Sequence, residues 1–187
     1  MSDHKAAPTF NTVTKPVEKK KVRDHFLITG PSFAGKTKLY YKLMGGDIGE
    51  SVSSSDVNIT AGTIPVKVPN RLLGRQTEEG ESAYAQIDAK FVDVPGHYNF
   101  KKTMQEESSG AKAVIVLLDS KDKSRFGEAA EVIYDLLGDI EIVSQEVPIL
   151  VACNKQDIAF AKNPLQIERE LATEIDQIRK VRKATLQ

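Results

Sequence analysis

One glycine-rich segment, GPSFAGKT at residues 30–37, combines residue types that together bind phosphate groups. It fits the pattern G-x-x-x-x-G-K-[ST], in which backbone N–H groups and a lysine surround phosphate oxygens. We expect Lys36 to neutralise the β- and γ-phosphates of a nucleotide and the Thr37 hydroxyl to bind Mg²⁺. The predicted nucleotide-binding residues of this segment are Gly30, Pro31, Ser32, Phe33, Ala34, Gly35, Lys36, Thr37 and Lys38.

A second segment, DVPG at residues 93–96, follows an apolar run. Asp93 can hold the water shell of the metal ion, and the Gly96 amide can bond a γ-phosphate. The spacing D-x-x-G arises often by chance, so it says little on its own. Its place after a phosphate-binding segment, at the end of the next expected strand, makes both residues part of the predicted site.

A third segment, NKQD at residues 154–157, ends the last apolar run. Asp157 can accept two hydrogen bonds, from N1–H and the N2 amino group of guanine, which adenine does not offer in that arrangement. We expect Asn154 to tie this loop to the phosphate-binding segment and the stem of Lys155 to lie across the base. In isolation the tetrapeptide also fits a helix cap, but its order behind the first two segments favours guanine binding.

A fourth segment, SVSSSDVNIT at residues 51–60, lies where a triphosphate-sensing loop is needed. A hydroxyl that reaches Mg²⁺ only when the γ-phosphate is present would order such a loop. Ser53, Ser54, Ser55 and Thr60 all qualify chemically. Local chemistry does not choose among them.

Strands and helices must bring these segments together. Near-continuous Val, Ile and Leu runs predict strands buried on both faces, as in a parallel sheet, at residues 25–30, 89–96, 113–120 and 147–157. Helical patterns occupy residues 36–46, 127–140 and 163–183. This alternation predicts a doubly wound α/β domain whose ligand binds at the carboxyl ends of the strands. Residues 62–69 and 84–95 predict an antiparallel hairpin.

The apolar spacing of two helical segments predicts the faces that they bury. In the segment at 127–140 the predicted face holds Ala130, Ile133, Tyr134 and Leu137. In the segment at 163–183 it holds Leu165, Ile167, Leu171, Ile175 and Ile178.

Length and charge limit the possible functions. The 187 residues carry 26 basic and 26 acidic side chains, which suits one domain and gives no reason to expect direct nucleic-acid binding. No apolar run reaches the ~18 to 20 residues that cross a bilayer, so we expect this chain to be soluble. Residues 1–23 predict a flexible polar leader, and residues 24–187 predict the folded domain.

With these segments in place, residues 24–183 resemble the Ras-like small GTPases. Within them the chain is most similar to the Arf/Sar branch and, there, to the beta-subunit family of the signal recognition particle receptor. The resemblance is carried by LITGPSFAGKTKLYYKL, SVSSSDVNI, FVDVPGH and LVACNKQDI. Ser54 falls on the switch threonine of the Arf pattern, so the resemblance makes Ser54 the expected metal and nucleotide ligand. Asn58 matches the asparagine that follows in that pattern.

The resemblance implies a three-layer P-loop NTPase domain with a mostly parallel sheet and one antiparallel edge strand. It implies GTP or GDP and Mg²⁺ as ligands, and slow or partner-triggered GTP hydrolysis. It also implies a switch subunit at the cytosolic face of the endoplasmic reticulum membrane, active in co-translational protein targeting. With GTP bound, that subunit forms a heterodimer with the N-terminal domain of the receptor alpha subunit, and the ribosome is then nearby.

The sequence departs from the family pattern at two places. The family has an N-terminal transmembrane helix that this sequence does not show, so membrane attachment is implied by the resemblance alone. Ras-like domains finish with a strand, whose loop lies against the guanine, and a closing helix. Residues 159–183 have a helical pattern instead. We therefore expect the C-terminal strand and helix of the GTPase (G) domain to be missing, which leaves the domain incomplete at that end.

His97 follows Gly96 directly, where Ras-like enzymes usually have the glutamine that positions the attacking water. A histidine there can position water, contact a partner or serve packing, and the sequence leaves these three roles open. A catalytic role for His97 is the working hypothesis.

Two other functions would use the same phosphate-binding segment. An Arf/Sar-like vesicle-trafficking GTPase would cycle on membranes through an amphipathic or lipidated N-terminus, and the leader has no Met-Gly start and little amphipathic character. An ATP-dependent kinase is disfavoured by Asp157, because its carboxylate suits guanine.

Overall fold

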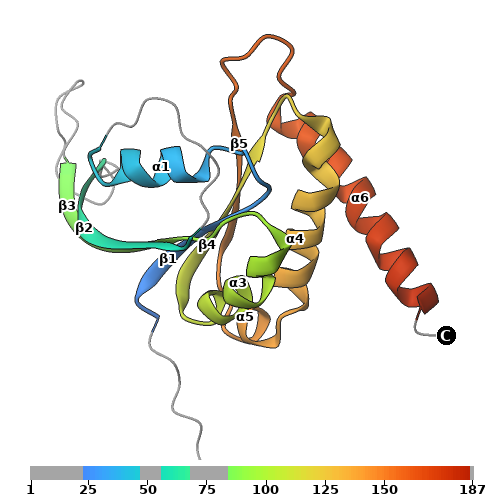
Figure 1. Ribbon diagram of the computed structural model, residues 1–187, viewed down its shortest axis with the longest axis horizontal. Coiled ribbons are helices and arrows are strands. Elements are labelled where there is room, and N and C mark those ends of the chain that lie inside the picture. Colours follow the sequence, from blue (N-terminus) through green and yellow to red (C-terminus); the bar gives the residue numbers. More distant parts are fainter. Residues whose placement is uncertain (1–22, 47–55, 68–83, 186–187) are drawn as a thin grey trace, which may run out of the picture.

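Five strands form one sheet in the order β2-β3-β1-β4-β5 (Figure 1). The computed structural model describes residues 23–46, 56–67 and 84–185. In chain order the strands are β1 (His25–Thr29), β2 (Asn58–Lys67), β3 (Tyr84–Asp93), β4 (Ala111–Asp119) and β5 (Ile149–Asn154). The expected hairpin is present, and its long connection lies outside the described residues.

Strand directions confirm the predicted mostly parallel sheet with one antiparallel edge strand. β1 pairs in parallel with both β3 and β4, and β4 pairs in parallel with β5. Only β2, paired with β3, runs antiparallel among the described strands. The carboxyl ends of the parallel strands therefore lie at the same end of the sheet. The predicted site residues are at or just after the ends of β1, β3 and β5.

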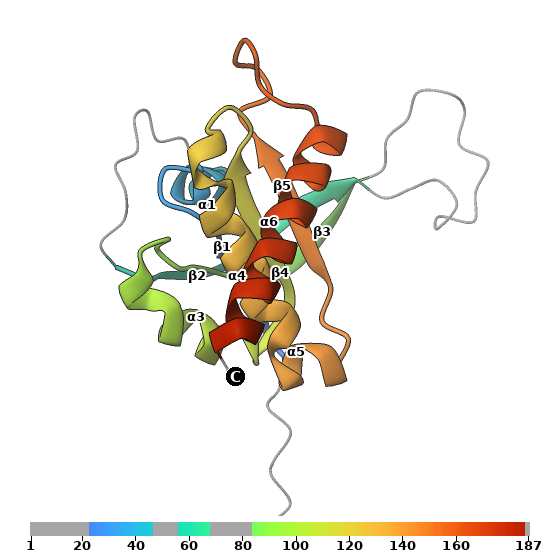
Figure 2. The same cartoon turned by 90° about the vertical axis from the view of Figure 1, so that its right-hand side faces the viewer.

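Helices cover both faces of the sheet and complete the three layers. α1 (Lys36–Leu43) lies on one face, and α3 (Lys101–Ser108), α4 (Phe126–Gly138) and α6 (Pro164–Thr185) lie on the other (Figures 1 and 2). The short helix α5 (Ile140–Ser144) follows α4, and single 3₁₀ turns, η1 (Tyr98–Phe100) and η2 (Lys123–Arg125), precede α3 and α4.

Two apolar clusters hold the layers together. The larger one packs Leu27, Val114 and Val116 of the sheet against side chains of α3, α4 and α6. The smaller one packs Ile28 and Phe91 against Tyr40 of α1. Burial of this apolar surface supplies the main free energy that orders the loops at the strand ends.

The helix faces predicted from spacing are partly wrong. Leu137 is 55% exposed, because α4 turns Leu136 toward the core instead, and Leu165 in the first turn of α6 is 66% exposed. Ile167 and Leu171 are buried, and Ile175 and Ile178 pack against the same core, as predicted.

The described chain after β5 forms one helix, α6, and no strand, in agreement with the helical pattern of residues 159–183. β5 consequently forms an edge of the described sheet. Within the ranges that the structure describes, no helix is both long and apolar enough to cross a membrane.

The leader predicted for residues 1–23 falls outside the described residues apart from Arg23. The Arg23 guanidinium donates to the side-chain and backbone oxygens of Gln145, just after α5. This contact fixes the start of the described chain at the end of the molecule away from the phosphate loop.

Candidate nucleotide site

The phosphate loop is the turn between β1 and α1. Gly30 and Gly35 have backbone φ angles of 129° and 94°, in the left-handed region that favours glycine. A side chain at position 30 would also run into the backbone of Leu117 in β4. The loop therefore wraps closely against β4, and its two glycines are required by its shape.

Lys36 is the buried cation of the site. Its side chain is 6% exposed, and its ammonium group donates to the Pro31 carbonyl oxygen at 2.9 Å. Burial lowers the pKa of Lys36 to about 8, although the negative charge of Asp93 acts in the opposite direction. An anion bound next to Lys36 would raise this pKa again and favour the protonated lysine.

Asp93, the last residue of β3, lies beside Thr37. Its Oδ2 atom accepts hydrogen bonds from the Thr37 hydroxyl at 2.9 Å and the Asn58 amide at 3.3 Å. Burial raises the pKa of Asp93, and these two hydrogen bonds oppose that rise.

The other oxygen of Asp93 is suited to a metal ion. Oδ1 is buried and has no hydrogen-bond partner among the described residues. A buried carboxylate oxygen without a partner is costly unless a ligand satisfies it. Hydroxyl and carboxylate oxygens are ligands that Mg²⁺ prefers, directly or through water, so Thr37 and Asp93 fit this metal.

Gly96 lies directly on the phosphate loop. A Cβ atom at this position would come within 2.6 Å of the Ser32 backbone nitrogen. Only glycine allows this approach, which brings the segment after β3 beside the loop that would hold phosphates.

The NKQD segment meets the phosphate loop at the end of β5. The Asn154 side-chain amide donates to the Ala34 carbonyl oxygen at 2.8 Å. The Lys155 ammonium binds Asp119 Oδ2 at 2.7 Å, which fixes the lysine stem. Asp157 is exposed and lines a cavity that it shares with Lys36 and Lys155.

Asp119 is a site residue that sequence reasoning missed. Burial acts to raise its pKa, but hydrogen bonds from Lys155 and from the Lys121 amide outweigh burial, and the pKa lies below its usual value. The carboxylate is thus held ionised as the partner of Lys155. Its position at the end of β4, in LLDS, was the only signal in the sequence.

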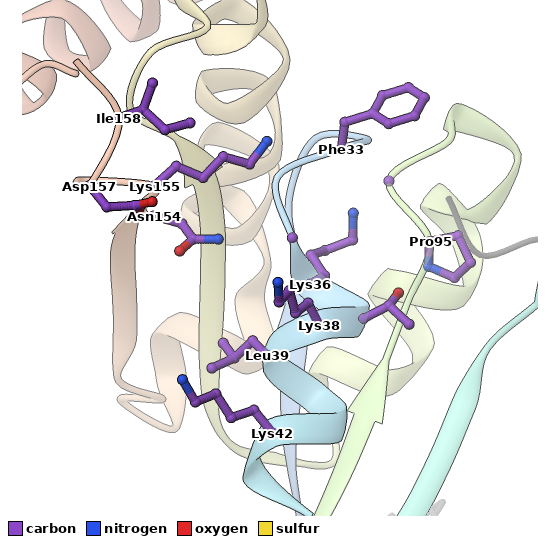
Figure 3. A pocket seen from close by; sticks show the side chains of 13 residues that line it. Phe33, Lys36, Lys38, Leu39, Lys42, Pro95, Asn154, Lys155, Asp157 and Ile158 are labelled. Atoms are coloured by element: carbon purple, nitrogen blue, oxygen red, sulfur yellow. The ribbon is translucent and has the colours of Figure 1, made fainter. Parts of the chain in front are cut away.

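One cavity of about 650 Å³ connects these groups (Figure 3). Its size is within the range of small-molecule sites. Lys36 lines one end and Asn154, Lys155 and Asp157 line the other (Figure 3). Thr37 also lines the cavity. Further predicted lining residues are Phe33, Gly35, Lys38 and Gly96, and lining residues that were not predicted are Leu39, Lys42, Pro95 and Ile158.

His97 lines a second cavity of about 380 Å³, between the phosphate loop, α3 and α4. This second cavity also contains Gly30, Pro31 and Ser32, and it shares Pro95 and Gly96 with the first. The His97 side chain is exposed, and its Nδ1 accepts a long hydrogen bond of 3.4 Å from the Asn99 amide. The predicted switch ligand Ser54 lies outside the described residues.

A three-layer domain of this topology, with a phosphate loop after its first strand, is a small GTPase by class. Residues 21–187 match the family model of the signal recognition particle receptor beta subunit. The chain belongs to that family.

Individual relatives include beta subunits of the receptor and an ADP-ribosylation factor. The beta subunit from Mus musculus is 30% identical over 160 residues, which cover 84% of this chain and 53% of the relative. ADP-ribosylation factor J from Dictyostelium discoideum is 31% identical over 165 residues, covering 88% and 76%. The chain spans about half the length (53%) of its mammalian relatives.

Solved structures show the same fold. The mammalian signal recognition particle receptor aligns with a TM-score of 0.59 at 27% identity, covering 84% of this chain and 76% of the other. The small GTPase Arl6 from Trypanosoma brucei, solved with the nucleotide analogue GppNp, aligns with a TM-score of 0.60 at 20% identity, covering 80% and 77%.

Proposed function

We propose that this chain is the GTP-binding switch subunit of a signal recognition particle receptor. One observation carries the proposal: a single cavity has the buried cation Lys36 at one end and the carboxylate of Asp157 at the other. The first suits a triphosphate and the second suits the hydrogen-bond donors of guanine.

Each part of the site has a defined task in this proposal. Lys36 and the backbone amides of the phosphate loop hold the β- and γ-phosphates, and Gly96 approaches the γ-phosphate. Bound Mg²⁺, held by Thr37 and through water by Asp93, would neutralise phosphate charge. Ser54 remains the proposed switch ligand on the basis of the family pattern. Asp157 selects guanine, while Asn154 and Lys155 keep the base loop next to the phosphate loop.

The family supports a role at the endoplasmic reticulum membrane, on its cytosolic face, in co-translational protein targeting. We propose that the GTP form binds the N-terminal domain of the receptor alpha subunit, and that attachment to the membrane uses a transmembrane helix outside this sequence. The similarity to ADP-ribosylation factor J keeps an Arf-like trafficking GTPase as a second candidate. The match to the beta-subunit family over residues 21–187 favours the receptor.

Partner binding should depend on the nucleotide. We expect an alpha-subunit N-terminal fragment to be retained by the chain loaded with a non-hydrolysable GTP analogue, with at least tenfold weaker retention in GDP. The physical reason is that switch residues are ordered by contacts to the γ-phosphate and its Mg²⁺. Pull-down and calorimetry with the two loaded forms measure the difference.

Equal binding of the fragment in both nucleotide states would contradict the switch role. A trafficking GTPase would instead bind lipid vesicles in GTP and leave the alpha-subunit fragment unbound. If the wild-type chain bound neither GTP nor GDP, the proposed function would be wrong.

His97→Ala tests the working hypothesis for this histidine. A water-positioning role predicts GTP turnover reduced about 10- to 100-fold with unchanged GTP affinity, because general acid–base groups contribute at least this much. A partner-contact role predicts weaker binding of the alpha-subunit fragment with unchanged turnover. Single-turnover hydrolysis and fragment binding, measured on one preparation, separate the two roles. If neither changes, both roles are wrong.

A further inference from the structure

Arg125 occupies the N-terminus of α4, where its charge does not stabilise the helix. It is the last residue of η2 and the N-cap of α4, and its side chain makes no capping hydrogen bond. N-cap positions favour short polar side chains such as Ser and Asp. The positive end of the helix dipole also repels a cation there. A guanidinium at this position is therefore unfavourable for the helix terminus itself, although Asp122 and Glu128 lie within ion-pair distance of it.

The guanidinium instead reaches the phosphate loop. Its central carbon lies 5.2 Å from the ring centre of Phe33, within the range of a cation–π contact. Phe33 is 60% exposed and has a φ angle of 62°, which is unusual for a residue other than glycine. The ring stands at the mouth of the cavity, above Lys36 (Figure 3). This contact keeps Arg125 at the rim of the phosphate site.

The carboxylates around Arg125 hold it loosely. Its Nε and Nη1 atoms each lie 3.3 Å from an oxygen, of Asp122 and Glu128 respectively. Both distances exceed those of strong charge-assisted hydrogen bonds, and both carboxylates are partly exposed. Such ion pairs are weak, so a phosphate can compete for the guanidinium.

The lining of the second cavity directs this charge toward the phosphate site. Arg125 lines the second cavity together with Ser32 and Gly96, and Gly96 is shared with the nucleotide cavity. The carboxylates of Glu131 and Asp135 also line the second cavity, but both pair with Lys101. Arg125 is therefore the cation of this cavity that lies against the phosphate loop.

We propose that the Arg125 guanidinium binds the terminal phosphate of GTP, held over the phosphate loop by Phe33. Arg125 then adds to Lys36 a second positive charge that GDP, which lacks that phosphate, does not engage. The inference rests on the proposed function and deepens it: it names a residue that makes the site prefer the triphosphate.

Arg125→Gln tests this inference, because glutamine keeps a polar side chain without the charge. We expect its affinity for a non-hydrolysable GTP analogue, measured with Mg²⁺ by fluorescence titration, to fall about tenfold, while GDP affinity changes less than threefold. Arg125→Lys retains the charge but not the planar guanidinium. Its affinity for the GTP analogue should lie between those of the wild type and Arg125→Gln. Because each protein is measured with both nucleotides, a change in the folded fraction cancels in the affinity ratio.

Arg182→Gln is the matched control. Arg182 also lies over an aromatic ring, at 4.6 Å from the Tyr134 ring centre, and pairs with Asp135, but it lines neither cavity. Its loss should leave the ratio of GTP to GDP affinity unchanged.

Phe33→Leu should weaken GTP binding less than Arg125→Gln, and the double variant should resemble Arg125→Gln, because the ring acts through the arginine. An unchanged affinity ratio in Arg125→Gln, or an equal loss for both nucleotides, overturns the inference. Wild-type protein that binds GTP normally in that experiment leaves the proposed function standing, whereas wild-type protein that binds neither nucleotide overturns both.

Discussion

Asp157→Asn should weaken GTP binding by at least about 100-fold and give the chain affinity for xanthosine triphosphate. The carboxylate of Asp157 can accept from both N1–H and the N2 amino group of guanine, and hydrogen bonds to a charged group contribute about 1.5 to 3 kcal/mol each. The asparagine amide replaces one acceptor with a donor, which suits the O2 atom of xanthine. Competition of both nucleotides against a fluorescent analogue measures the exchange of specificity.

Asp176→Asn is a suitable control, since Asp176 is exposed on α6 and pairs with Arg179. It should leave both affinities unchanged. If Asp157→Asn retains full GTP affinity, the assignment of NKQD to guanine is wrong. Because Asp157 is exposed, loss of folding is not expected to obscure the result.

Lys36→Met should abolish measurable nucleotide binding and at the same time stabilise the nucleotide-free protein. Lys36 is 6% exposed, and burial is the main cause that lowers its pKa to about 8, so the folded state bears a cost for holding its charge. Methionine has a similar shape without that charge. We expect the free energy of unfolding to rise by about 1 to 2 kcal/mol, as in other cases where a functional site is traded for stability.

The stabilisation has a defined dependence on pH. Below pH 8 the lysine is protonated in both states, and the full cost applies. Between about pH 8 and the unfolded value of 10.5 the folded state releases its proton first. The stability of the wild type therefore rises relative to the methionine variant across this range, and the difference between them shrinks.

Urea unfolding without nucleotide, measured at pH 7 and pH 9.5, tests both statements. Lys38→Met, at an exposed neighbouring position, should change stability little. A methionine variant less stable than wild type at pH 7 would show that the hydrogen bond to the Pro31 carbonyl outweighs the cost of the buried charge.

The strands, their directions and the phosphate loop were predictable because their signals are local. Near-continuous apolar runs mark β1, β4, β5 and the second half of β3, and GPSFAGKT carries its spacing within eight residues. The doubly wound topology then places the carboxyl ends of β1, β3 and β5 at one edge of the sheet. Lys36 and Asp157 were therefore predictable as members of one site.

Contacts between distant segments were not predictable in the same way. Nothing near Arg125 indicates that it reaches Phe33, and nothing near Asp119 indicates that it holds Lys155. The misplaced Leu137 has a similar origin, because the buried stripe of α4 is set jointly by the sheet and by α6. The spacing of apolar residues along one helix shows that one side is buried. It does not show which side chains at the boundary of that side face the sheet and α6.

The hydrogen bond from Asn154 to Ala34 has a consequence for the order in which the molecule is made. Its partners are 120 residues apart in the chain, and the ribosome adds about 5 to 20 residues per second. The phosphate loop therefore leaves the ribosome about 6 to 24 s before the residue that braces it. During that interval a nascent chain lacks both this brace and Asp157, so selective capture of a guanine nucleotide has to wait until the segment after β5 has been made.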